Sequence, residues 1–139
     1  MTRVGRYAFF VLAWAFVVGL LAQVFFIGLA LFADEGAVQL HVDFGWILHL
    51  APILVLIAAA LGRTGRGTIG LAATLAVVVF IVPLLPSTRG GTPVVAALHP
   101  VLAIIAFALA IVVAWRATAA AFAPVRDEER TAEPAAAPR

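Results

Sequence analysis

The chain contains no cysteine and no lysine, and only 12% of its 139 residues are charged. The absence of cysteine excludes a disulfide scaffold, a thiolate metal site and a cysteine nucleophile. Ordinary soluble domains carry about 25% charged residues. Because 65% of this chain is hydrophobic, a soluble fold of this size could not bury all of its apolar surface. The composition therefore indicates a protein whose solvent is the lipid bilayer.

Four long apolar runs predict an all-α integral membrane protein, built as a four-transmembrane-helix bundle. The runs are continuously apolar, whereas the strands of a membrane barrel alternate between apolar and polar residues. Segments rich in glycine and proline separate them and mark the loops. The predicted helices cover about residues 7–33, 42–61, 68–86 and 93–115 within a transmembrane domain of residues 7–116.

The arginines predict the orientation of this bundle. Eight of the nine fall on one side, and Arg89 alone falls on the other. By the positive-inside rule, both termini are cytoplasmic (N-in/C-in), with a cytoplasmic N-terminus at residues 1–6 and a disordered cytoplasmic tail at 117–139. The arginines that give the net charge of +2 lie at helix ends rather than along one face. Nucleic acid is therefore not expected as a partner, and the expected partner is the lipid bilayer.

The sequence contains no phosphate loop, no nucleophile elbow and no zincin motif, so nothing in it indicates an enzyme. The polar residues that remain within the apolar runs are Gln23, His49, His99 and Thr74. Ionisable groups inside a membrane are candidates for function. His49 and His99 are expected at similar depths on diagonal helices, which suits a pair of axial ligands to the iron of haem b. A metal is expected only through that haem iron.

Other residues have supporting roles in this hypothesis. Gln23 would tune the pocket, Gly45 would leave room beside His49, and Arg89 would pair with a haem propionate or remain a solvated loop arginine. His41, at the outer mouth of the second helix, is expected to have an interfacial, structural or pH-responsive role. These residues would place a b-type haem nearer the outer face.

Two alternatives remain open at this point. In the first, both histidines only hold helices together, for example through Gln23, and the protein is a cofactor-free structural or accessory subunit. Such a subunit would work in a homo-oligomer or a larger membrane complex. In the second, the same residues serve a small transporter or proton-conducting element, although no carboxylate lies within the apolar runs.

Several short motifs carry a resemblance to a known group of proteins. They are Gln23–Phe32, His41 with Gly45, Arg63, and the Ala-Leu-His-Pro sequence at 97–100. Over about residues 5–116 the chain resembles a small four-helix bacterial membrane protein family of unknown function. This resemblance implies the bacterial cytoplasmic (inner) membrane and no established activity. A fainter similarity to four-helix units of the cytochrome b561 and haem A synthase type implies haem, although those proteins usually carry more histidines.

Overall fold

The computed structural model describes residues 2–123, which form four long helical segments joined by short turns. The segments are Thr2–Phe32, Glu35–Leu61, Arg66–Gly90 and Pro93–Phe122. The shortest has 25 residues, and at 1.5 Å per residue it extends about 37 Å, beyond the ~30 Å of a hydrocarbon core. All four are long and apolar enough to cross a membrane, which confirms the predicted all-helical, four-span architecture.

Only the first of these segments is one continuous helix. In chain order the elements are α1 (Thr2–Phe32), η1 (Glu35–Ala37), α2 (Val38–Leu48), α3 (Ala51–Leu61), α4 (Arg66–Ile81), η2 (Val82–Leu84), η3 (Pro86–Gly90), α5 (Pro93–Ala96) and α6 (Leu98–Phe122).

The breaks coincide with prolines, which cannot donate a backbone hydrogen bond to the carbonyl four residues earlier. Pro52 leaves the Leu48 carbonyl without its helical partner, and α2 ends at Leu48. Pro100 does the same to Ala96, where α5 ends. Pro86 follows η2 and begins η3. Three of the four segments are thus interrupted within the apolar region.

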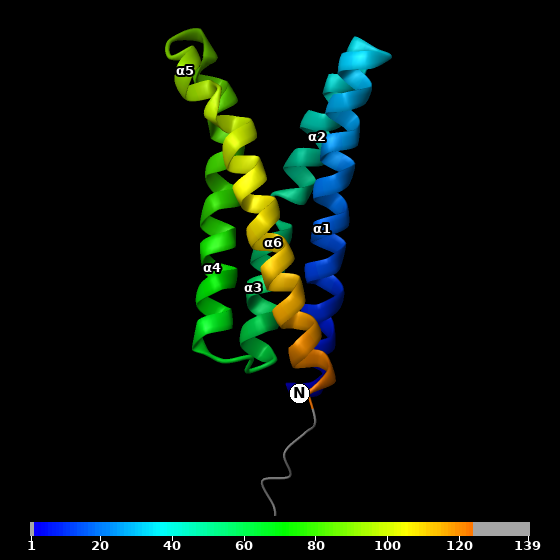
Figure 1. Ribbon diagram of the computed structural model, residues 1–139, viewed down its shortest axis with the longest axis vertical. Helices are drawn as coiled ribbons and strands as arrows, with labels where there is room; N and C mark the ends of the chain where they lie inside the picture. The colour runs from blue at the N-terminus through cyan, green and yellow to red at the C-terminus, as the bar shows by residue number, and fades with distance from the viewer. Residues whose placement is uncertain (1, 124–139) are drawn as a thin grey trace, which may run out of the picture.

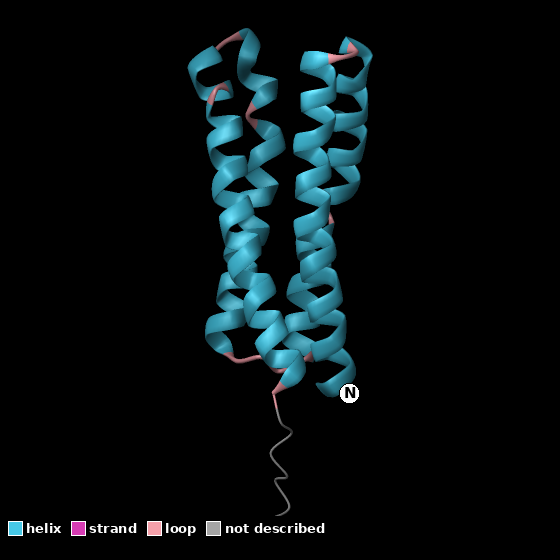
Figure 2. Ribbon diagram, turned by 45° about the vertical axis from the view of Figure 1, so that its right-hand side comes forward, coloured by secondary structure: helices cyan, strands magenta, loops and turns pink. Residues whose placement is uncertain are grey.

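The helices pack closely at one end and diverge at the other (Figures 1 and 2). The start of α1, the turn between α3 and α4, and the end of α6 lie together; we call this the termini end. Opposite to it, α1 with α2 separates from the group formed by η2, η3, α5 and the start of α6. We call this the splayed end.

The hydrophobic core lies in the half of the bundle toward the termini end. Its largest fully buried side chains include Phe9, Phe16, Val55, Leu75 and Val113. Alanines from all four segments fill the remaining space and allow the helices to approach closely. By contrast, α2, η2, η3 and α5 contain no buried residue. The splayed end is therefore much less tightly packed.

Two helix starts differ from the predicted bounds because polar side chains are accommodated inside the helices. α1 begins at Thr2 rather than near residue 7, and Arg6 Nε donates to the Gly62 carbonyl oxygen at 3.3 Å. α2 begins at Val38 rather than near residue 42, and Gln39 Nε2 donates to Asp43 Oδ1 at 2.7 Å. Such pairs four residues apart stabilise a helix, so Asp43 does not end it.

The fourth segment also extends farther than predicted. It continues to Phe122 rather than ending near 115, because the alanine-rich stretch after Arg116 has high helix propensity. Residues 117–122 of the predicted tail thus belong to α6. The rest of that tail, residues 124–139, lies outside the described residues.

Backbone-to-backbone packing joins α1 to the end of α3 at the termini end. A Cβ atom added at Gly5 would lie 2.6 Å from the Gly62 backbone nitrogen and 2.7 Å from the Leu61 carbonyl carbon. Real Cβ atoms do not approach backbone this closely, so the two helices meet only because Gly5 has no side chain. Gly28, higher on the same helix, has no such neighbour within 4 Å.

We expect Gly5→Ala to destabilise the protein by about 1–3 kcal/mol, because the added methyl group must push α1 and α3 apart. The matched control is Gly28→Ala, which should be neutral or stabilising by up to about 1 kcal/mol, since alanine favours helix. Thermal unfolding of both variants in one detergent checks this. Equal unfolding midpoints for the two variants would contradict the packing described here.

Candidate functional site

His41 lies on α2 with its ring anchored to α1. Its Nδ1 is 3.0 Å from the backbone carbonyl oxygen of Gln23. A carbonyl oxygen can only accept, so Nδ1 carries the proton and donates. The Nε2 atom of this half-buried imidazole is consequently left unprotonated in the neutral ring, which is the form that binds a metal.

His99, near the start of α6, is anchored in the same manner to the neighbouring segment. Its Nδ1 is 2.8 Å from the Val82 carbonyl oxygen in η2. Pro86 has no N–H to give to this carbonyl, which accepts from the Leu85 N–H at 3.4 Å and from the imidazole at 2.8 Å.

The two anchored rings face each other across the divergence of the helices. The ring centroids of His41 and His99 are 6.3 Å apart, and their planes are inclined by 78°. One ring comes from the α1–α2 side of the splayed end and the other from the η2–α6 side. This contact therefore joins two groups of helices that separate toward their outer ends (Figure 1).

His49 is placed differently from the other two histidines. It lies at the break between α2 and α3, and its ring packs on Phe80 of α4 with centroids 4.1 Å apart. Trp46 lies on another side of the ring at 5.9 Å. The histidine that the structure pairs with His99 is thus His41 rather than the His49 expected from the sequence.

The reason lies in where the second helix begins. The sequence predicted that the second helix begins near residue 42, because Asp43 looks like the end of an apolar run. With that start, His41 lies at the mouth of the helix and His49 lies within it. Because α2 starts at Val38, His41 is already in its first turn, beside Gln23. An early helix start was signalled by the Gln39 and Asp43 spacing, which supports a helix through both residues.

Gln23 and Gly45 form the floor of this site between α1 and α2. A Cβ atom at Gly45 would meet Gln23 Nε2 at 2.7 Å, so the glycine makes room for the glutamine side chain. Gln23 Oε1 is buried and has no hydrogen-bond partner among residues 2–123. A buried acceptor left unpaired is costly, and such atoms in native proteins often mark places where another molecule binds.

Arg89 lies away from this floor. It is exposed in η3 at the tip of the splayed end.

The spacing of the two imidazoles matches that of two ligands on one metal. With metal–nitrogen bonds of about 2.0 Å and about 1.1 Å from nitrogen to ring centre, a linear pair has its ring centres about 6.2 Å apart. Among residues 2–123, His, Asp and Glu side chains form no group of three suited to a metal ion. The two imidazoles thus come from two different groups of helices and lie at a centroid spacing compatible with two ligands on one metal.

Part of the chain matches a known protein family. Residues 23–89 match the model of a family of unknown function, DUF6220. The matched stretch is just under half of the chain and contains Gln23, His41, Gly45 and His49, whereas His99 lies beyond it. This confirms the predicted relation to a family of unknown function. No curated protein and no solved structure matches the chain, and the similarity to haem-binding units remains a prediction.

The anchoring predicts which nitrogen of each ring carries the proton. In neutral His41 and His99 we expect protonated Nδ1 and unprotonated Nε2, because a carbonyl oxygen lies at Nδ1. Nitrogen NMR of protein labelled at histidine measures this directly, and the variants His41→Gln and His99→Gln assign the signals. Protonated Nε2 in both rings would contradict these hydrogen bonds.

Proposed function

We propose that this protein binds haem in the membrane, with His41 and His99 as the two axial ligands of the iron. The observation that carries the proposal is the pair of imidazoles 6.3 Å apart, each held at Nδ1 by a backbone carbonyl. Haem-ligating and metal-ligating histidines characteristically use their second nitrogen in this way, which fixes the ring and raises its basicity.

The number of ligands favours haem over a bare ion. Structural and catalytic zinc sites use three or four protein ligands, and residues 2–123 offer no such group. Haem supplies four nitrogens of its own and needs only the two axial positions from the protein. When bound, it would supply one-electron oxidation and reduction.

The surroundings of the pair also suit a large, flat group. Neither α2 nor α5 buries a single residue, so a macrocycle bound between them would not displace the hydrophobic core. Gln23 Oε1 provides a buried acceptor that no other group in the described part of the chain pairs with. His41 and His99 orient the group, and the apolar helix faces exclude water from it.

The absorption spectrum of protein purified from haem-replete cells tests this assignment. We expect a Soret band and a sharp α band on reduction, both lost in His41→Ala and in His99→Ala. The matched control is His49→Ala, which should keep the wild-type bands because its ring packs on Phe80. If His99→Ala fails to fold, His99→Met should retain iron with a shifted spectrum, since methionine is also an axial ligand.

Two results would contradict the proposal. Loss of the bands in His49→Ala but not in His41→Ala would return the ligand pair to His49 and His99. A well-folded wild-type protein that takes up no added haem would favour a cofactor-free structural or accessory subunit.

We further propose that both termini lie in the cytoplasm and that the membrane is the inner membrane of a bacterium. Arginines gather at the termini end, whereas Arg89 lies at the splayed end with Asp34, Glu35 and Asp43. The positive-inside rule then places the termini end in the cytoplasm, and the resemblance to bacterial membrane proteins supports the bacterial inner membrane. In this orientation the histidine pair lies nearer the outer face.

Because the chain has no native cysteine, single substitutions give a clean test of orientation. We expect Ser87→Cys, in η3, to react with a membrane-impermeant maleimide added to intact cells. Thr64→Cys, in the turn between α3 and α4, should react only after the membrane is opened. The reverse pattern would invert the topology.

A further inference from the structure

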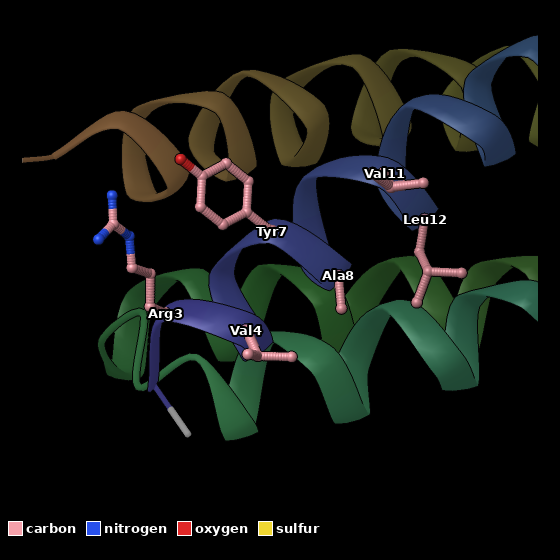
Figure 3. A pocket seen from close by; sticks show the side chains of 6 residues that line it. All are labelled: Arg3, Val4, Tyr7, Ala8, Val11 and Leu12. Carbon is pink, nitrogen blue, oxygen red and sulfur yellow. The ribbon is translucent and has the colours of Figure 1, made fainter.

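A shallow groove on the side of α1 that faces away from the bundle, at the termini end, is a second candidate binding site. It is independent of the histidine pair. It encloses about 650 Å³ and is lined by Arg3, Val4, Tyr7, Ala8, Val11 and Leu12. These residues follow one face of the helix and cover about 13 Å along its axis. Figure 3 shows Arg3 and Tyr7 toward the start of α1, with Val11 and Leu12 farther along.

The groove combines three chemical features in the order in which a phospholipid presents them. The lining of the groove itself is apolar, and Arg3, exposed at its end, has a guanidinium that is a donor for a phosphate group. Tyr7, 41% exposed, has the amphipathic ring typical of the level of lipid headgroups and esters. Beyond it the wall is wholly aliphatic and open to the bilayer, with Val11 59% exposed.

Contacts with α6 hold this groove in shape. The ring of Tyr7 packs edge-on against the ring of Phe122, with centroids 6.3 Å apart. Phe10 also packs edge-on against Phe122, with centroids 5.6 Å apart. The end of α6 therefore supports the tyrosine from behind. A preformed wall reduces the entropy lost when a ligand binds.

The same residue types recur in a second groove on α6. There Arg116 and Trp115 lie beside Ile111 and Val112, in a hollow of about 500 Å³. Both grooves lie in the half of the bundle toward the termini end, where α1 begins and α6 ends. An arginine and an interfacial aromatic above an aliphatic wall is thus a repeated arrangement of this half.

We propose that the α1 groove binds one anionic phospholipid, with its phosphate on Arg3, its ester region at Tyr7 and an acyl chain along Val11 and Leu12. Charge complementarity selects an anionic headgroup over a zwitterionic one, because the latter brings a cationic group to the same arginine. The site faces the leaflet at the termini end and does not depend on haem.

Native mass spectrometry of the full chain, released from detergent with phosphatidylglycerol or with phosphatidylcholine of identical chains, tests this. We expect wild-type protein to retain phosphatidylglycerol preferentially. Arg3→Gln should lower that retention several-fold, and Val11→Asn should lower retention of both lipids. Glycerol phosphate, which lacks acyl chains, should not compete.

Two arginine variants outside both grooves serve as controls. Arg63→Gln removes a charge from the turn at the same end, and Arg89→Gln removes one from the opposite end; both should retain lipid like wild type. Equal retention of the two lipids, or an equal loss in Arg3→Gln and Arg63→Gln, would overturn the proposal. A lipid-independent dimer that Val11→Asn dissociates would overturn it as well, because a second copy would then occupy the groove.

Discussion

In a bilayer, every backbone carbonyl that a proline releases must find another donor or face water, because hydrocarbon offers none. The splayed end of this protein is shaped by that requirement. Pro52, Pro86 and Pro100 interrupt three of the four spanning segments. One of the carbonyls that lose the N–H four residues later, that of Val82, accepts from the His99 ring at 2.8 Å as well as from the Leu85 N–H at 3.4 Å. A constraint on the backbone thus positions a side chain that carries the candidate site.

The two halves of the bundle differ in packing: one contains the hydrophobic core, and the other contains the candidate site. Toward the termini end, alanines and a few large side chains form a dense core, and Gly5 lets α1 touch the backbone of α3. Toward the splayed end no such core exists, and the helix groups meet through His41 and His99. Regions that bind ligands are generally drawn from the less tightly packed parts of a fold. The packed half can therefore hold the bundle together, and the open half is where we propose that a large group binds.

The fold could be predicted from the sequence because hydropathy in long apolar runs leaves few alternatives to membrane helices. The identity of the paired histidine could not, because it depends on helix starts and breaks of a few residues. Asp43 looks like the end of an apolar run, yet its hydrogen bond with Gln39 lets α2 begin at Val38. Pro52 then ends α2 beside His49, whose ring packs on Phe80. The sequence prediction assumed an uninterrupted second helix and therefore placed His49 beside His99, whereas the structure places His41 there.

Electron paramagnetic resonance of the oxidised, haem-loaded protein tests the central proposal most directly. Two axial imidazoles make the iron six-coordinate and low-spin, and planes inclined by 78° predict a strongly anisotropic signal. We expect this signal in wild-type protein and in His49→Ala, and its loss in His41→Ala. A high-spin, five-coordinate iron in wild-type protein, or an unchanged low-spin signal in His41→Ala, would contradict the assignment of His41 and His99 as the ligands.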